Sequence, residues 1–293
     1  MMKIPCDEYM LVNTVEEALA LLGERRGNAR IISGGSDLLL ELQQGDCSPI
    51  GRLVDVTEID ELCALEIRNR TLFIGAAVTL ARLANSELVK AHAQALSDAT
   101  SLMANPQVCN VATIGGNVAH ALPAADGTIA MLVLDAQANI AGRTGRRLVP
   151  LSSMFKGPGE STLDPCDDLL VGFHLPIREK MQSSAFARRV NPQGIALAML
   201  NLAIWLDRDG ERIHAVRVAV GPSGPVPRRM RYVERALSDQ VYKPGLLDRV
   251  VEVLLQETHF RSSPHRATAE YRRHLAGVLL KEAFVEAWER AGE

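Results

Sequence analysis

The chain has 293 residues, of which 47% are hydrophobic and 23% charged, and its formal net charge is -3. This balance is typical of a globular protein and speaks against a nucleic-acid partner, because nucleic-acid-binding domains usually carry a basic excess. The length exceeds the usual size of one domain, about 100–200 residues, and so predicts two domains.

The N-terminal segment and the cysteines point to the cytoplasm. The first residues contain no continuous apolar segment of the kind found in signal peptides, and no run of about 18 apolar residues occurs elsewhere. The five cysteines are odd in number, and none stands in a CxxC pair. We therefore expect reduced thiols in a cytoplasmic protein that has no membrane span and binds no metal itself.

The first half of the chain mixes helices and strands with local pairings. A helix is expected over residues 15–22, because Thr14 and Glu17 form a capping box and Gly23 follows. Buried strands are expected at residues 29–33 and 52–56. Residues 65–67 and 72–75 have the pattern of a hairpin, and helical segments follow from 79 to about 103. These elements predict an α+β fold.

A domain crossover is expected within residues 164–178, where prolines interrupt the pattern, and we place the boundary near Arg178. Beyond it lie three apolar runs, residues 184–190, 195–206 and 212–220, of which the last two are joined by a hairpin turn at residues 207–210. They predict a small antiparallel sheet. Helical periodicity follows, with one apolar stripe on Leu246, Val250, Val253 and Leu254 and a longer helix over residues 268–291.

Two glycine pairs are the main chemical signal. Gly34-Gly35 lies between a predicted strand and a helix that Ser36 or Asp37 can cap. Gly115-Gly116 precedes a helix predicted to start near Asp126. Glycine turns of this kind expose backbone N–H groups, so two of them could bind one diphosphate.

Each pair taken alone is more simply a tight turn, so the signal depends on both. Neither a GxGxxG nor a GxxxxGK[ST] motif occurs, so a Rossmann unit or a P-loop cannot explain a nucleotide site. A non-Rossmann flavin fold is the open alternative.

The two motifs resemble those of a known family. Residues 33–39, SGGSDLL, are similar to the A-G-G-T-D-L signature of the flavin subunits of xanthine dehydrogenase and its relatives. Residues 110–117, NVATIGGN, followed by 123–126 and 134–136, are similar to that family's R-N-x-A-T-I-G-G-N...P-x-A-D...L-D-A pattern, with Cys109 in place of the arginine. The resemblance covers nearly the whole chain.

This resemblance implies a fold and a set of cofactor-binding residues. The fold is a two-subdomain FAD-binding domain of the vanillyl-alcohol-oxidase type over residues 1–178, split near 57–60, followed by a CO-dehydrogenase-flavoprotein-type C-terminal domain over 179–293. The implied cofactor-binding residues, none of them catalytic, are Ile31, Ile32, Ser33, Gly34, Gly35, Ser36, Asp37, Leu38, Met103, Thr113, Ile114, Gly115, Gly116, Asn117, Asp126, Leu170 and Arg188.

Several of these positions also have simpler interpretations. Asp126 would hydrogen-bond the cofactor, but Met103 and Leu170 are explained equally well by core packing. Arg188 stands near a family lysine, and a surface arginine on a strand is the alternative. His120 is expected to be a neighbour of the site or a structural residue, because the resemblance implies that FAD is bound non-covalently. Replacing Gly115 by a β-branched residue should remove FAD and retain the fold.

The implied function is electron relay within a complex. A large partner subunit would carry the molybdenum cofactor, a small one the [2Fe-2S] clusters, and this chain would pass electrons through FAD to NAD or another acceptor. Two alternatives stay open. The first is a stand-alone FAD-dependent oxidoreductase of the same flavin-fold superfamily, for which no proton donor is evident. The second is a cofactor-free assembly subunit, which the intact glycine pairs disfavour.

Overall fold

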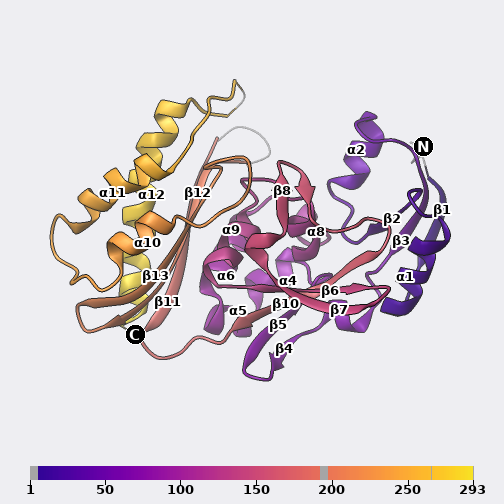
Figure 1. Cartoon of the computed structure of the whole chain (residues 1–293), viewed down its shortest axis with the longest axis horizontal. Helices are drawn as coiled ribbons and strands as arrows, with labels where there is room; N and C mark the ends of the chain where they lie inside the picture. The colour runs from indigo at the N-terminus through magenta and orange to yellow at the C-terminus, as the bar shows by residue number, and fades with distance from the viewer. Residues whose placement is uncertain (1–5, 192–196, 265, 293) are drawn as a thin grey trace.

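The computed structural model describes residues 6–191, 197–264 and 266–292, and it confirms the predicted α+β class. Three larger sheets follow one another along the long axis of the molecule (Figure 1), and a fourth sheet has only two strands. The first is small and parallel, the second is a five-stranded antiparallel sheet, and the third is a three-stranded antiparallel sheet covered by the last helices. Within the described residues, no helix is long and apolar enough to cross a membrane.

The first sheet has the strand order β1-β3-β2, and all its strands are parallel. Its elements are β1 (Cys6–Leu11), α1 (Val15–Glu24), β2 (Ala29–Ile32), α2 (Leu38–Gln44) and β3 (Ile50–Asp55). The predicted capping interaction is present, since the Glu17 N–H donates to Thr14 Oγ1 at 3.1 Å. The helix was expected to end at Gly23, which is wrong, because a helical glycine is tolerated at a cost of about 1 kcal/mol. The helix continues through Glu24, its C-cap is Arg25, and the turn that follows contains Gly27, where φ is 81°.

The second sheet has the order β4-β5-β10-β6-β7. The expected hairpin and the expected helical region are confirmed. The elements of this region are α3 (Asp60–Cys63), β4 (Leu65–Arg68), β5 (Thr71–Gly75), α4 (Leu80–Asn85), α5 (Glu87–His92), α6 (Gln94–Leu102), α7 (Pro106–Cys109), α8 (Ile114–Ala119), α9 (Asp126–Val133), β6 (Gln137–Gly142), β7 (Gly145–Pro150), β8 (Phe155–Gly157), β9 (Glu160–Ser161) and β10 (Asp168–Pro176).

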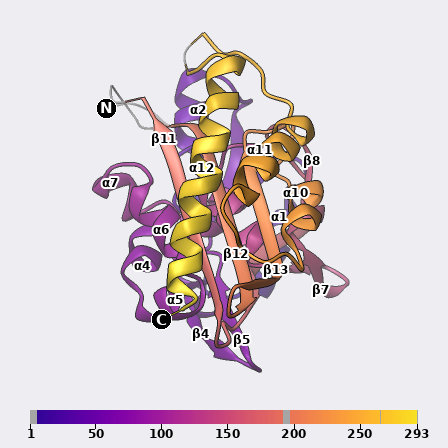
Figure 2. The same cartoon turned by 90° about the vertical axis from the view of Figure 1, so that its left-hand side faces the viewer.

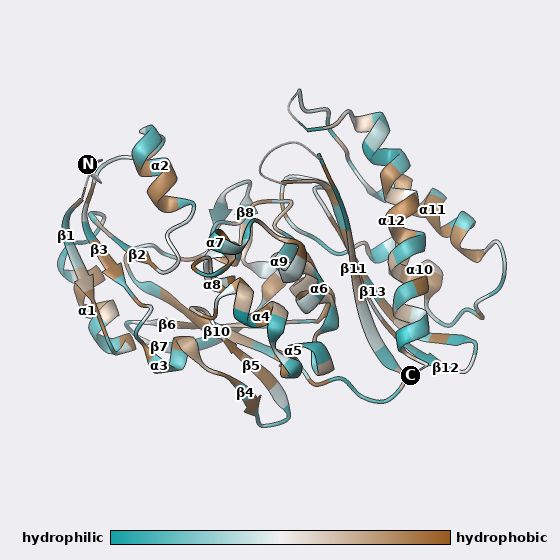
Figure 3. Ribbon diagram, turned by 180° about the vertical axis from the view of Figure 1, so that it is seen from behind, coloured by the Kyte–Doolittle hydropathy of each residue, from teal (hydrophilic) through white to brown (hydrophobic). Residues whose placement is uncertain are grey.

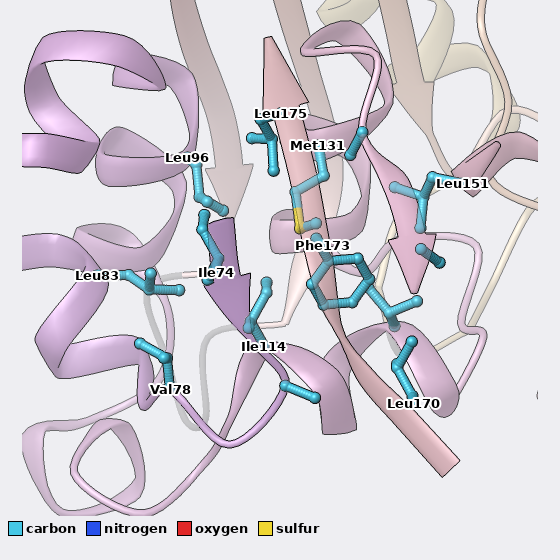
Figure 4. Packing of buried hydrophobic residues seen from close by; sticks show 14 of the residues in the cluster. Ile74, Val78, Leu83, Leu96, Ile114, Met131, Leu151, Leu170, Phe173 and Leu175 are labelled. Carbon is cyan, nitrogen blue, oxygen red and sulfur yellow. The ribbon is translucent and has the colours of Figure 1, made fainter. Parts of the chain in front are cut away.

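Strand β10 corrects the interpretation of residues 164–178 as a crossover between domains. It is the central strand of the second sheet, between β5 and β6, and Val171 and Phe173 on it are fully buried. Figure 4 shows Phe173 and Leu175 of this strand among Ile74, Ile114 and Met131. The prolines stand before the strand and at its end, where a missing N–H does not interrupt the sheet.

The predicted C-terminal sheet and helices are confirmed. They are β11 (Gln182–Val190), β12 (Ala198–Asp209), β13 (Arg212–Gly221), α10 (Arg231–Leu237), α11 (Leu246–Glu257) and α12 (Ala269–Arg290). Of the predicted strand over 195–206, residues 195 and 196 lie outside the described residues. The long helix α12 crosses one face of this sheet (Figure 2). Along α12, hydrophilic and hydrophobic bands alternate (Figure 3), which is the pattern of a helix with one buried face.

Helices α6 and α9 pack against the C-terminal sheet and join it to the second sheet. Polar contacts reinforce this junction. The Ala95 N–H donates to Ser184 Oγ at 3.0 Å, and Arg217 Nη1 donates to the Val133 carbonyl at 3.1 Å. Arg290 pairs with Asp98 at 2.7 Å. The C-terminal sheet is therefore fixed against the helices that precede and follow the second glycine motif.

Candidate functional site

The two glycine motifs lie in contact, although they are far apart in the sequence. A Cβ placed on Gly34 would stand 2.1 Å from the Val111 carbonyl oxygen and 2.7 Å from the Ala112 Cα. Real side chains do not approach a backbone so closely, so this contact requires glycine at position 34. The structure thus brings the loop after β2 against the segment that enters α8, as binding of one diphosphate by both motifs requires.

The first motif, the loop of residues 33–37, presents unpaired donors. Gly35 has φ 67°, in the left-handed region that favours glycine. Within the described residues, the backbone N–H groups of Gly34, Gly35, Ser36 and Asp37 donate to no acceptor. Beside them, the Ser33 Oγ atom is buried and has no hydrogen-bond partner among the residues that the structure describes. The loop is therefore suited to an anion that accepts several hydrogen bonds.

The side-chain cap predicted for α2 is not formed. Asp37 occupies the N-cap position, but its side chain makes no capping hydrogen bond, and its backbone is already helical, with φ -92° and ψ -49°. A side-chain cap normally needs an extended backbone at this position. The carboxylate instead lies 3.6 Å from Nδ1 of His120, the C-cap residue of α8.

The second motif corrects the expectation of a turn ahead of a distant helix. Gly115 and Gly116 lie inside the short helix α8, whose N-cap is Thr113. The Ile114 N–H donates to the Val78 carbonyl, the Gly115 N–H to the Ala76 carbonyl and the Gly116 N–H to Thr113 Oγ1, over 2.9 to 3.2 Å. These donors are thus satisfied by the protein itself, unlike those of the first motif.

The two glycines of this second motif have different roles. A Cβ on Gly115 would stand 2.5 Å from the Ala76 carbonyl oxygen, so glycine is needed there for backbone packing. This contact argues against the expectation that a β-branched residue at position 115 retains the fold, because the Ala76 backbone would have to move. Gly116 is exposed, and a Cβ on it would meet only Thr113 Oγ1, at 3.3 Å. Gly116 therefore presents bare backbone to solvent.

Asn117 fixes α8 to the next helix. Its Oδ1 accepts from the Thr128 N–H at 3.1 Å and from the Thr128 hydroxyl at 3.2 Å. Thr128 lies in α9 and is fully buried. The position of α8 relative to α9 is therefore set by a side chain of the motif itself.

Asp126 and Arg188 form a buried ion pair between α9 and β11, with 8% and 6% of their side chains exposed. The alternative that Arg188 is a surface residue is therefore wrong. Asn201 on β12 donates to the same carboxylate and, at 3.0 Å, to the Ala124 carbonyl. Burial raises the pKa of the Asp126 carboxyl, and the charge of Arg188 opposes the rise. Both carboxylate oxygens of Asp126 already accept from the protein, so its contact with a cofactor stays a prediction.

Asn201 was not predicted from the sequence. Its only signal is an amide in the middle of an otherwise apolar strand, residues 198–206. Its Oδ1 is buried and has no partner within the described residues. A buried amide costs free energy unless it is hydrogen-bonded, and the Nδ2 bonds of Asn201 to Ala124 and Asp126 join the C-terminal sheet to the start of α9.

Met103 and Leu170 lie in different surroundings. Met103 is half-buried at the end of α6, and its carbonyl accepts from Cys109 Sγ at 3.0 Å. Leu170 on β10 is 7% exposed and belongs to the main core (Figure 4), which accords with core packing. Among the described residues there is no group of three or more histidine, cysteine, aspartate or glutamate side chains placed to hold a metal ion.

Comparisons with known proteins identify the family. Residues 4–178 match the model of the FAD-binding domain in molybdopterin dehydrogenase, and residues 185–287 match that of the CO dehydrogenase flavoprotein C-terminal domain. The chain belongs to this family of FAD-binding proteins. It is 30% identical to a xanthine dehydrogenase FAD-binding subunit of Escherichia coli O157:H7, over 97% of each chain. It is 29% identical to the nicotine 6-hydroxylase medium subunit of Paenarthrobacter nicotinovorans, over 99% of this chain and 100% of that one.

The fold of this chain agrees with that of a relative whose structure is solved. Carbon monoxide dehydrogenase from Hydrogenophaga pseudoflava superposes with a TM-score of 0.92 at 27% identity, over 99% of each chain. The present chain is thus an FAD-binding oxidoreductase subunit of the molybdenum hydroxylase family. The first glycine motif fits this cofactor, because its four unpaired N–H groups and the unpartnered Ser33 hydroxyl match the acceptors of a diphosphate.

Proposed function

We propose that this chain binds FAD non-covalently in a multi-subunit complex, accepts electrons from [2Fe-2S] clusters of a small partner subunit, and passes them to NAD or another acceptor. In this proposal a large partner subunit holds the molybdenum cofactor, and the complex is cytoplasmic. Support comes from relatives that are themselves named FAD-binding subunits and medium subunits. Those names favour a subunit over a stand-alone enzyme or a cofactor-free assembly subunit. Bound FAD supplies the exchange between one-electron and two-electron transfer.

The observation that carries the proposal is the unpaired donor loop held against α8. In the proposed complex, the backbone N–H groups of Gly34, Gly35, Ser36 and Asp37 and the Ser33 hydroxyl donate to the diphosphate. Ile32 anchors the start of this loop because it is buried in a small core of its own. Ile31 and Leu38, at the two ends of the loop, are half-buried and would line the site.

The second motif would supply shape more than donors. The exposed backbone of Gly116 would lie against the cofactor, and the half-buried Asn117 beside it would line the same face of the site. Thr113, Ile114 and Gly115 would fix α8 in place through their bonds to residues 76–78 and to Gly116. This division of roles explains why both glycines are needed while only one faces outward.

The remaining expected site residues would act around the isoalloxazine ring. We propose that Met103 and Leu170 lie near it. Asp126 and Arg188, joined to Asn201, would fix the C-terminal sheet beside the site. The proposed domain limits are 1–178 and 179–293, with the first domain divided near 57–60. The family matches that end at 178 and start at 185, and the end of β3 at Asp55, support these limits.

Replacing Gly116 by valine tests the proposal. The added side chain would occupy the outer face of α8, so we expect FAD binding to be lost while the melting temperature is retained. Gly23→Val is a matched control, because Gly23 is also a helical glycine with room for a Cβ, 3.7 Å from the nearest atom, the Arg143 Nη1. Binding is measured by quenching of FAD fluorescence. A native chain that binds no FAD in excess, or a Gly116→Val variant that binds it normally, contradicts the proposal.

A further inference from the structure

His120 connects the two glycine motifs through its side chain. Its Nε2 lies 3.2 Å from Glu41 Oε1, and its Nδ1 lies 3.6 Å from Asp37 Oδ2. His120 is the C-cap residue of α8, whereas both carboxylates belong to the start of α2. The imidazole is 28% exposed, so it lies between the two helices and still reaches solvent.

The backbone around His120 ties it directly to both motifs. The His120 N–H donates to the Gly116 carbonyl at 3.0 Å, so the ring is attached to the glycine that faces outward. Asp37 is the last residue of the donor loop, and its carboxylate makes no capping bond that would hold it on α2. Ser36 Oγ, at 3.3 Å, is the other side-chain donor to this carboxylate within the described residues. The orientation of the loop end therefore depends on His120.

We propose that protonated His120 is a positioning residue that holds the donor loop, residues 33–37, against α8 in the conformation that binds FAD. The proposal rests on the proposed function and extends it, because His120 acts through Asp37 and Glu41 without touching the cofactor. The imidazolium can bind both carboxylates at once, one through each ring nitrogen, whereas neutral imidazole carries only one N–H. Position at the carboxyl end of α8 also favours the charged form.

The electrostatics give this connection a pH dependence. The nearby Asp37 carboxylate, 3.6 Å from Nδ1, is the main cause that raises the pKa of His120; partial burial opposes the rise, and the charge of Glu41 adds to it. The charged groups that face His120 are these two carboxylates of α2. Because the pKa in the folded chain is above its unfolded value, the stabilisation is complete below the unfolded value, about 6.5, and is lost as pH rises through the folded one. FAD affinity should therefore fall as pH rises.

The test is the dissociation constant of FAD as a function of pH, measured on the native chain and on His120→Gln, Asp37→Asn and His214→Gln. We expect the FAD affinity of the native chain to fall about two- to fivefold between about pH 6 and pH 9, which is the range for partly exposed ion pairs. His120→Gln should bind as weakly at about pH 6 as the native chain does at pH 9, with a flat profile. His214→Gln removes an exposed histidine on β13 and should match the native profile.

Asp37→Asn separates positioning from direct contact. If His120 acts through Asp37, this variant weakens FAD binding and flattens the pH profile. If His120 instead donates directly to the diphosphate, removal of a nearby negative charge strengthens binding, and the proposal is overturned. His120→Lys retains a charge that does not titrate in this range and should restore affinity at high pH. Should His120→Gln fail to fold, as judged by circular dichroism, Asp37→Asn alone decides.

The two proposals fail in different ways. A native chain that binds no FAD at any pH overturns the proposed function and this inference together. A native chain that binds FAD with a profile as flat as that of His120→Gln leaves the proposed function intact and overturns only the positioning role. High salt gives an independent readout, because screening should reduce the native affinity at about pH 6 toward that of the variant.

Discussion

The two Gly-Gly pairs look alike in the sequence and differ in the structure. Gly34-Gly35 lies in a loop whose N–H groups have no acceptor among the described residues, whereas Gly115-Gly116 lies in a helix whose N–H groups are already bonded. The first pair therefore offers backbone N–H donors, whereas the second lies in a helix packed closely against neighbouring backbone. One member of each pair, Gly34 and Gly115, is required by contact with another stretch of backbone. A glycine pair can thus mark either a ligand-binding loop or a place where two backbones meet.

Gly34→Ala should have the largest effect, because its Cβ would stand 2.1 Å from the Val111 carbonyl oxygen and separate the two motifs. We expect FAD binding to be lost and the free energy of unfolding to fall by about 3 kcal/mol, at the upper end for overpacked positions. Urea unfolding should be followed by far-ultraviolet circular dichroism, since Trp205 and Trp288 both lie in the C-terminal elements. A Gly34→Ala variant that retains FAD would show that the contact between the motifs is dispensable.

Gly115→Ala should have the next largest effect and a different character. Its Cβ would press on the Ala76 backbone at 2.5 Å, so we expect the free energy of unfolding to fall by about 2 kcal/mol. FAD binding should weaken in parallel, because the outer face of α8 at Gly116 would shift together with the helix. Gly23→Ala serves as the control in both experiments: it should leave FAD binding unchanged and raise the free energy of unfolding by no more than about 1 kcal/mol, the helix penalty of glycine. If Gly115→Ala removed FAD at full stability, the glycine would face the ligand, and the roles of Gly115 and Gly116 would be reversed.

Local patterns predicted much of the fold. The capping box at Thr14, the hairpin of β4 and β5 and the antiparallel C-terminal sheet each depend on neighbouring residues, and all are found. Strand β10 was not predicted, because it pairs with β5 and β6 far away in the sequence and its prolines suggested a linker. Non-local pairing leaves no periodic signal in the strand itself, so only the folded structure reveals it.

The candidate site was predicted in its parts but not in its connections. The glycine motifs were predicted to meet around one diphosphate; their contact through Gly34 is found, and diphosphate binding stays a prediction. The sequence did not show that Asp126 pairs with Arg188 and Asn201, because each lies on a different element. It also did not distinguish a glycine needed for its backbone conformation, such as Gly35, from one needed for close approach, such as Gly115. Both requirements are met by glycine, so the sequence alone does not separate them.

Ser33→Ala should have the smallest effect and gives the sharpest test of the donor loop, because stability and affinity should move in opposite directions. Ser33 Oγ is buried without a partner among the described residues, so its removal should raise the free energy of unfolding of the FAD-free chain by about 1 kcal/mol. The same change removes a donor to the diphosphate and should weaken FAD binding about fivefold, which is the ordinary worth of one hydrogen bond. Thermal melts with and without FAD measure both effects in one preparation. A variant that melts lower without FAD, or binds it as tightly as the native chain, would mean that this hydroxyl serves the protein core and does not face the ligand.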